Sequence, residues 1–382
     1  MALTDDTERA GSYLPQPGGY RSFAPRPLPP EPPVAMGLDL QRRLSLADRA
    51  LGRLDGSIRT LPNPDLFVFM YVRKEAVLSS QIEGTQSSLN DLLEAEAEIL
   101  ASDRPKDVDE VLNYVRAMNF GLERLRELPV SIRLIREIHA QLMQGVRGGQ
   151  RQPGELRRIQ NGIGPAGCTV NEASFVPPPP QSVADHLAAL ETFLHTDTLP
   201  ALIQIGLAHA QFETIHPFLD GNGRVGRLLI AFLLYEKGIL QTPVLYLSHH
   251  FKRHRQEYYE RLQAVRDRGE WEAWLDFFLD GVHQVATEAT ATARAIVDLR
   301  EAHSKLIAAE FGRVAGNGLR VLERLYARPI IKVQDIVDLC GVTFPAANNL
   351  MGKFVHHGLL AEITGQARNR QFRYGGYIDL FQ

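Results

Sequence analysis

The most informative part of this chain is a twelve-residue stretch, His216-Pro217-Phe218-Leu219-Asp220-Gly221-Asn222-Gly223-Arg224-Val225-Gly226-Arg227. It lies between two apolar segments, PALIQIGLAHAQFETI (200–215) and RLLIAFLLYEKG (227–238), whose periodicity predicts helices. Gly221 and Gly223 let backbone N–H groups approach a ligand closely, and a helix that begins near Gly223 would direct its positive dipole end at the same ligand. The stretch therefore predicts an anion-binding turn between two helices.

The charged residues of this stretch supply the parts of a phosphate-transfer site. Arg224 and Arg227 are three residues apart, so on a helix they share one side, and guanidinium groups bind phosphate oxygens bidentately. Asp220 is a carboxylate beside the turn, and Mg²⁺ is held by one or two carboxylates together with the phosphates of its substrate. His216 can act as a general base near neutral pH. Together these groups predict transfer of a group from a nucleotide to a hydroxyl.

Other interpretations of the same stretch fit less well. Its glycine spacing also matches the dinucleotide fingerprint G-x-G-x-x-G, but that motif follows a β-strand, whereas a helix is predicted here. A Walker loop is excluded because no Gly-Lys-Ser/Thr ends the motif. A hydrolytic metal centre built from His209, His216 and Asp220 matches no standard zinc spacing and leaves both arginines unexplained. A packed histidine with solvated arginines is the ordinary alternative, which the combination of residues disfavours.

The composition limits the class of protein. The chain has 382 residues and a mass of 42.7 kDa, which predicts two or three domains. Hydrophobic residues make up 44%, enough for a sizeable core, and the net charge of −3 gives no whole-chain attraction to nucleic acid or membrane. Two distant cysteines, Cys168 and Cys340, favour a reducing compartment. No apolar run reaches about 18 residues and no leader pattern begins the chain, so we expect a cytoplasmic protein without a membrane partner.

Changes in periodicity along the chain predict a mainly α fold divided into five regions. These are a proline-rich extended arm without chemistry (1–35), a helical N-terminal region (36–128), a helical core (129–290), a connecting helix (291–312) and a separate C-terminal domain (313–382). The last region predicts three helices followed by two short alternating strands. That order is typical of a winged helix-turn-helix domain.

The string HPFLDGNGRVGR at 216–227 resembles the complete Fic signature, H-x-F-x-D/E-G-N-G-R-x-x-R, at every specified position. The resemblance covers roughly residues 40–285 and identifies 129–290 as a Fic catalytic core. Fic proteins mostly transfer the AMP part of ATP to a Ser, Thr or Tyr hydroxyl of a protein and release pyrophosphate. The resemblance therefore implies ATP as substrate, Mg²⁺ as cofactor, a target protein, self-modification and a homodimer.

The resemblance also assigns roles to the polar residues of the motif. His216 would deprotonate the target hydroxyl for attack at the α-phosphorus. Asp220 would hold Mg²⁺ across the α- and β-phosphates. Arg224 and Arg227 would hold the β- and γ-phosphates. These roles agree with those inferred above from the chemistry of the side chains.

The small residues of the motif belong to the nucleotide site by the same resemblance. Asn222, with the backbone of Gly221 and Gly223, would form the anion hole. Val225 and Gly226 complete the segment that binds the nucleotide.

An upstream segment, Ser79-Ser80-Gln81-Ile82-Glu83-Gly84, resembles the Fic inhibitory motif S/T-x-x-x-E-G/N, with Ser79, Glu83 and Gly84 at the specified positions. Glu83 could pair with Arg227 and occupy the guanidinium that the γ-phosphate needs. The alternative is a glutamate on a solvated helix face, which the downstream signature disfavours. In some relatives the equivalent glutamate also supports removal of AMP, and the sequence leaves the direction of the reaction open.

Two further segments are matched less specifically. The glycine-rich stretch between 148 and 180 predicts a loop with a hairpin, and it resembles the Fic flap that pairs with the target by strand addition, with Ile163 and Gly164 at the matching positions. The prolines at 177–180 could instead bind a partner as a polyproline II segment. Tyr258 and Tyr259 match an aromatic pair that lines the nucleotide site in relatives, and a place in the core is the equal alternative.

The C-terminal region, 313–382, contains nine basic and five acidic residues, a net charge of +4. Its presumed recognition helix and wing offer groups suited to phosphates and base edges: Asn348, Asn349, Lys353, Arg368, Arg370 and Arg373. DNA binding and use of the domain for dimerisation or target docking are equally compatible with this pattern. The sequence thus leaves open a DNA-binding regulator whose Fic core senses nucleotide, and transfer of phosphate, UMP or phosphocholine instead of AMP.

Overall fold

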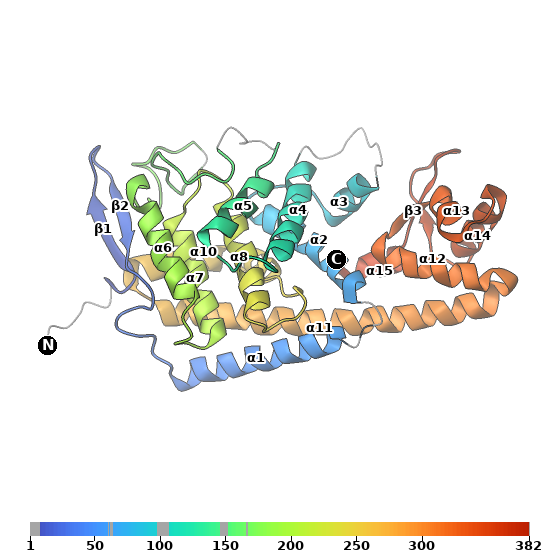
Figure 1. Cartoon of the computed structure of the whole chain (residues 1–382), viewed down its shortest axis with the longest axis horizontal. Coiled ribbons are helices and arrows are strands. Elements are labelled where there is room, and N and C mark those ends of the chain that lie inside the picture. The colour runs from blue at the N-terminus through green and yellow to red at the C-terminus, as the bar shows by residue number, and fades with distance from the viewer. Residues whose placement is uncertain are drawn as a thin grey trace.

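The computed structural model describes residues 8–59, 61, 64–97, 107–145, 152–165 and 167–381. Helices dominate, and two small antiparallel sheets lie toward opposite ends of the long axis (Figure 1). The first seven residues of the expected arm, and residues 148–151 and 166 of the expected loop, lie outside the described part. No helix among the described residues combines the length and the apolar character that a membrane crossing needs.

The N-terminal region departs from the extended arm that the prolines predicted. Strands β1 (Gly11–Pro15) and β2 (Arg21–Pro25) form an antiparallel hairpin in which Tyr13 lies opposite Phe23. Phe23 is fully buried, and its ring contacts those of Tyr13 and Phe175. The hairpin forms because β2 supplies an aromatic side chain to the core of the molecule, which a proline count does not reveal.

Helix α1 (Leu38–Arg59) lies along α11 (Trp271–Glu310), although the two are more than 200 residues apart in sequence (Figure 1). Helix α11 is continuous over 40 residues. The boundary expected between the core and the connecting helix, at 290/291, falls inside α11. Ala289, Ala293 and Ile296 continue the buried face of the helix across that position.

Helices α2 (Pro64–Ile82), α3 (Leu89–Glu96) and α4 (Val108–Arg124) complete the N-terminal region. The core contains α5 (Ile132–Leu142), α6 (Val183–Leu194), α7 (Ala201–Ile215), α8 (Asn222–Glu236), α9 (Ser248–Arg253) and α10 (Arg255–Arg268), with a 3₁₀ turn at Pro180–Ser182 before α6. Every residue of α7 from Leu202 to Ile215 is buried, which explains its nearly uniform apolar sequence. The turn from α7 to α8 consequently lies in the middle of the core.

The flap region between α5 and α6 is mostly irregular. In the described residues from 152 to 179, the expected hairpin is reduced to one antiparallel pair, in which Ile163 and Phe175 exchange both backbone hydrogen bonds at 2.8 and 3.1 Å. Phe23 of β2 donates its N–H to Val176 O at 2.8 Å. The N-terminal hairpin therefore supports the back of the flap.

The C-terminal region contains α12 (Ala315–Ala327), β3 (Ile330–Lys332), α13 (Val333–Cys340), α14 (Phe344–His356), β4 (Ala361–Glu362) and β5 (Gln371–Arg373), preceded by a 3₁₀ turn at Gly312–Val314. The strands form an antiparallel sheet in the order β3-β5-β4. Strand β3 was not predicted. A short helix, α15 (Gly375–Ile378), and a 3₁₀ turn, η4 (Asp379–Phe381), bring the end of the chain back beside α2 (Figure 1).

Candidate active site

The turn between α7 and α8 is held in shape by its own backbone. His216 ends α7 in the left-handed conformation, with φ 48° and ψ 61°, and Gly221 precedes α8 with φ 76°. The side-chain amide of Asn222 accepts from Phe218 N–H at 2.8 Å and donates to Phe218 O at 2.9 Å. Asn222 therefore shapes the turn with its side chain, and what it can offer an anion is its backbone N–H at the start of α8.

His216 is positioned from outside the motif. Arg157 donates from Nε to the His216 carbonyl oxygen at 2.9 Å, and its own backbone N–H donates to Pro217 O at 2.9 Å. Burial, together with the nearby Arg266 and Arg157 guanidinium groups, lowers the pKa of His216 to about 3. The imidazole is therefore neutral at physiological pH, which is the form that a general base requires.

A second histidine, His139 of α5, fixes the Asp220 end of the turn. His139 Nδ1 accepts from Gly154 N–H at 2.8 Å, so its Nε2–H donates to Asp220 O at 3.1 Å. The ring stacks on Phe218 with centroids 3.7 Å apart. His139 was missed because its partners come from two other elements that are distant in sequence.

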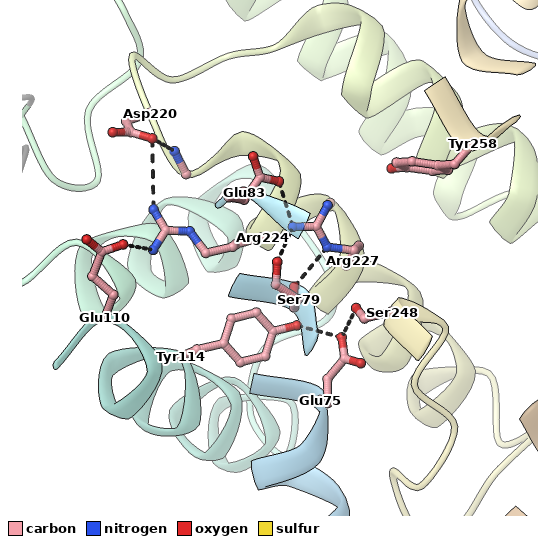
Figure 2. Close-up of polar contacts among 12 residues, drawn as sticks. Glu75, Ser79, Glu83, Glu110, Tyr114, Asp220, Arg224, Arg227, Ser248 and Tyr258 are labelled. Atoms are coloured by element: carbon pink, nitrogen blue, oxygen red, sulfur yellow. Dashed lines mark hydrogen bonds and ion pairs between the residues drawn. The ribbon is translucent and has the colours of Figure 1, made fainter. Parts of the chain in front are cut away.

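The two arginines of the motif have different partners, as Figure 2 shows. Arg224 Nη1 pairs with Glu110 of α4 at 3.2 Å, and its Nη2 lies 3.9 Å from Asp220 Oδ1. The Asp220 carboxylate also accepts from Gly221 N–H at 2.7 Å. Glu110 was not among the predicted residues, because nothing in its sequence surroundings marks it.

Arg227 is held by the end of α2 (Figure 2). Its Nε donates to Ser79 Oγ at 2.8 Å, and its Nη2 donates to Ser79 O at 3.0 Å and to Glu83 Oε1 at 2.7 Å. Burial would raise the pKa of Glu83, but Arg227, with smaller effects of Arg224 and His216, holds it below its usual range. Gly84 follows with φ 103°, a conformation that favours glycine. Glu83 and Arg227 are therefore an ionised pair.

The same glutamate lies over the start of α8. A Cβ added to Gly223 would come within 2.2 Å of Glu83 Oε1 and 3.0 Å of Arg227 Nη1. A side chain at this position would therefore displace the Glu83 carboxylate from its place beside Arg227. The carboxylate occupies the place next to the helix N-terminus where an anion would bind.

Below Arg227, a buried polar cluster joins α2, α4 and α9 (Figure 2). Glu75 Oε1 accepts from Tyr114 OH at 2.9 Å and from Ser248 Oγ at 2.6 Å. Burial raises the pKa of Glu75 to about 7, although both hydroxyls and Arg227 act in the opposite direction. Burial likewise raises the pKa of Glu213, at the end of α7, to about 7. None of these groups was predicted, since only the fold brings them beside the motif.

Comparison with known proteins finds family matches over two stretches of the chain. Residues 41–123 match the family model described as the Fic/DOC family N-terminal region, and residues 129–234 match that of the Fic/DOC family. Over these two stretches the chain is similar to the Fic/DOC family.

Curated relatives resemble the chain over part of their length. A probable protein adenylyltransferase of Aquifex aeolicus is 28% identical over 208 residues, which are 53% of this chain and 57% of that protein. The protein adenylyltransferase Fic of Drosophila erecta is 30% identical over 176 residues, 45% of this chain and 32% of the relative. The Drosophila melanogaster protein of the same name is 28% identical over 259 residues, which are 65% of this chain and 48% of that relative. The chain thus spans between a third and somewhat over half of these relatives.

Solved structures share the fold. A Fic family protein from Desulfovibrio desulfuricans superposes with a TM-score of 0.60 at 18% identity, over 90% of this chain and 97% of that one. A Fic domain containing signaling protein from Bacteroides thetaiotaomicron superposes with a TM-score of 0.53 at 18% identity, over 67% of this chain and 97% of that one. The shared architecture in the first case extends beyond the residues that the family models match.

Two further residues of the 216–227 motif lie in the core. The Val225 side chain is buried beside α5 residues such as Leu134 and Ile138, so only its backbone could contact a ligand. A Cβ on Gly226 would lie 2.4 Å from Glu213 Oε1 and 3.1 Å from Phe212 Cδ1, so glycine lets α8 pack closely on α7.

The two residues of the predicted aromatic pair, Tyr258 and Tyr259, lie in different environments. Tyr258 is buried in an aromatic cluster, and its hydroxyl donates to His209 Nε2 at 2.9 Å because His209 Nδ1–H donates to Gly226 O. Tyr258 therefore follows the core alternative, and it lies apart from the Arg227 pair in Figure 2. Tyr259 remains 40% exposed. Since both nitrogens of His209 are engaged, the metal-centre alternative with His216 and Asp220 is excluded.

The flap residues face solvent in part. Gly164 is exposed, and a Cβ there would come within 2.8 Å of Cys168 Sγ and 3.2 Å of Ala173 Cα. Ile163 is half-buried and pairs with Phe175. Asn161 Nδ2 donates to Phe218 O at 3.0 Å, which ties the flap to the Fic motif.

Asp220 meets the requirement of a magnesium ligand that is shared with a substrate. Its side chain is 37% exposed at the mouth of the anion-binding turn. In the described part of the chain, no three His, Cys, Asp or Glu side chains come together as a metal cage. A single carboxylate beside a phosphate site is nevertheless the arrangement that Mg²⁺ uses with nucleotides.

The residues proposed for DNA contact are only partly brought together. Arg370 Nη2 donates to Asn348 Oδ1 at 3.0 Å, which joins the β4–β5 connection to α14, and Asn349 and Arg368 are exposed. Two others are engaged elsewhere. Lys353 lies 3.4 Å from Glu310 O, and Arg373 pairs with Asp379 at 2.7 Å.

Proposed function

We propose that this chain is a protein adenylyltransferase that transfers AMP from ATP to Ser, Thr or Tyr hydroxyls and is restrained by its own Glu83. The reaction is supported by the Fic/DOC domains and by the names of the curated relatives. The restraint is carried by one observation: the Glu83 carboxylate lies 2.7 Å from Arg227 Nη2 and next to the first turn of α8. A γ-phosphate would need the same guanidinium and the same helix end.

The chemistry follows from the positions of the side chains. Neutral His216 takes the proton of the target hydroxyl as its oxygen attacks the α-phosphorus of ATP. The new oxygen–phosphorus bond forms while the bond from the α-phosphorus to the bridging oxygen breaks, and the electron pair leaves with pyrophosphate. Arg224, Arg227 after release from Glu83, and the N–H groups of α8 offset the charge on the leaving phosphates.

Asp220 would hold Mg²⁺ together with the phosphates of ATP. The ion supplies positive charge that stabilises the negatively charged phosphates during transfer. His139 supports the position of this carboxylate, because its hydrogen bond to Asp220 O fixes the backbone from which the side chain extends. We therefore regard His139 as a positioning residue for Asp220.

The restraint acts through charge and space together. The Arg227 guanidinium is already hydrogen-bonded to Ser79 and Glu83, so ATP would have to displace a partly buried ion pair to bind in the productive position. Repulsion between Glu83 and the γ-phosphate adds to this cost. Removal of the carboxylate should therefore activate the protein.

Transfer of label from α-³²P-ATP with Mg²⁺ tests the proposal. We expect strong protein labelling by Glu83→Gly, little by the unaltered chain, and none by Glu83→Gly/His216→Ala. Glu127→Gly, which removes a glutamate that is 74% exposed and remote from the Fic motif, should behave like the unaltered chain. Silence of every variant, with γ-labelled ATP and UTP also inactive, would contradict the proposed reaction.

The same reagents test whether the chain modifies itself and whether it mainly adds or removes AMP. Label on the chain's own band in the Glu83→Gly reaction indicates self-modification. If the labelled protein then loses AMP on addition of the unaltered chain, Glu83 supports the reverse reaction. Retention of the label would assign the chain to the forward direction.

A DNA-binding regulator is the second candidate function. It is favoured by the hydrogen bond from Arg370 to Asn348, which fixes a basic loop against α14 in the way that a wing accompanies a recognition helix. Asn349 and Arg368 lie exposed on the same two segments. Both activities are compatible in one chain, since they use different regions.

A further inference from the structure

Helix α2, whose end precedes Glu83, is in contact with the C-terminal region at its other end. Phe67 and Tyr71 of α2 stack with ring centroids 4.2 Å apart, and Phe381 of η4 lies 5.4 Å edge-on from Tyr71 and 6.4 Å from Phe67. All three side chains are buried. The last turn of the chain is therefore part of the environment of the helix that leads to the inhibitory glutamate (Figure 1).

The contact continues into the C-terminal domain. Tyr377 lies 5.4 Å edge-on from Phe381 and 4.8 Å from Tyr326 of α12, and all of these rings are buried. A second link joins the same domain to α3, where Gln371 Nε2 of β5 lies 3.5 Å from Ala97 O. The domain thus contacts both α2 and α3, although the proposed chemistry requires neither contact.

Helix α2 can transmit a displacement between these two sites. From Phe67 to Ile82, the residue before Glu83, the helix rises about 22 Å at about 1.5 Å per residue. Between them, Glu75 is hydrogen-bonded to Tyr114 and Ser248, and Ser79 is hydrogen-bonded to Arg227. A helix that is fixed at both ends and in the middle presents Glu83 to Arg227 in one position.

We propose that the C-terminal domain is a clamp that holds α2 in its inhibitory position, with Phe381 as the contact residue. This inference rests on the proposed restraint by Glu83 and names what maintains it. A ligand that favours the undocked domain would raise transferase activity, up to the factor set by its differential affinity for the two states. The clamp gives the C-terminal domain a role in controlling the active site, whatever it binds.

The test compares Phe381→Ala with Phe344→Ala in the full chain. Phe344→Ala makes the same chemical change on the exposed surface of α14, where Phe344 is 55% exposed. With α-³²P-ATP and Mg²⁺, we expect Phe381→Ala to increase labelling by about tenfold over the unaltered chain, and Phe344→Ala to leave it unchanged. Phe381→Ala/Glu83→Gly should label no faster than Glu83→Gly alone, because the restraint is already absent.

A merely destabilising effect would lower labelling, so a gain of activity identifies the clamp. Hydrogen exchange of the amides from 79 to 83 should accelerate in Phe381→Ala, and Phe381→Leu provides a second variant if the alanine variant does not fold. Unchanged labelling and exchange in a folded Phe381 variant, with Glu83→Gly active, would overturn the inference. An inactive Glu83→Gly would instead contradict the proposed function itself.

Discussion

The His216 imidazole is neutral at physiological pH, since burial, together with Arg266 and Arg157, lowers its pKa to about 3. Removal of Glu83, which acts to raise this pKa, would lower it further. We therefore predict that labelling by Glu83→Gly changes by less than about twofold between pH 5.5 and 6.5 on account of His216. The initial rate at saturating ATP and Mg²⁺ measures this. A tenfold fall per pH unit with a midpoint near 6.5 would show an imidazole that is exposed to water instead.

Glu75 makes stability depend on pH. Its pKa is about 7 in the folded chain against an ordinary value of 4.5, so between these pH values the folded chain binds the additional proton. The free energy of unfolding therefore falls as pH rises from 4.5 to 7, by roughly 3 kcal/mol at most. Glu75→Gln cannot ionise, so its stability relative to the unaltered chain should increase from pH 5.5 to pH 8.

Urea unfolding at the two pH values checks the Glu75 prediction. Glu301→Gln is the control, because both members of this ion pair on α11 are exposed. The Glu301 side chain is 60% exposed, and that of its partner Lys305 is 80% exposed. It should shift the unfolding free energy by less than about 0.5 kcal/mol at either pH. A difference between Glu75→Gln and the unaltered chain that does not vary with pH would contradict the assignment.

At the scale of elements, the β1–β2 hairpin stabilises the flap. Phe23 is fully buried against Phe175, and its N–H is bonded to Val176 O. We predict that Phe23→Ala costs about 3 kcal/mol of stability and accelerates amide exchange at Ile163 and Phe175 more than in α7. Leu14→Ala, on the same hairpin but 46% exposed, should do neither. Equal acceleration in flap and α7 would indicate general destabilisation.

At the scale of the whole molecule, α11 joins the Fic core to the C-terminal domain, which contacts α2 as well. If the basic loop and α14 bind DNA, Arg368→Glu/Arg370→Glu in the full chain should weaken binding of a 30-base-pair duplex about tenfold or more, and lower its salt dependence. Fluorescence anisotropy at 50 and 200 mM salt measures both. His216→Ala should bind as the unaltered chain does, and binding unaffected by the arginine substitutions would favour a docking role for the domain.

The local chemistry could be predicted from the sequence because it is local in the chain. His216, Asp220, Arg224 and Arg227 lie within one turn and the first turns of one helix, so their spacing alone determines that they share a site. The uniform apolar pattern of α7 and α8 similarly predicts two buried helices. At 290/291 the periodicity correctly indicated helix, and the domain boundary expected there falls inside α11, which continues because it packs along α1.

Only the tertiary structure shows which groups from other parts of the chain lie around the 216–227 motif. His139, Arg157, Glu110 and Glu75 are 60 to 150 residues from the motif, and each is positioned by elements that meet only in the folded chain. Glu83 lies between the two cases: its motif suggested a partner for Arg227, and the fold brings the carboxylate to 2.7 Å from it. The sequence alone determined which groups the 216–227 segment contributes, because residues this close in the chain cannot separate. The fold determined their ionisation and their long-range partners, because burial and pairing between distant segments exist only after folding.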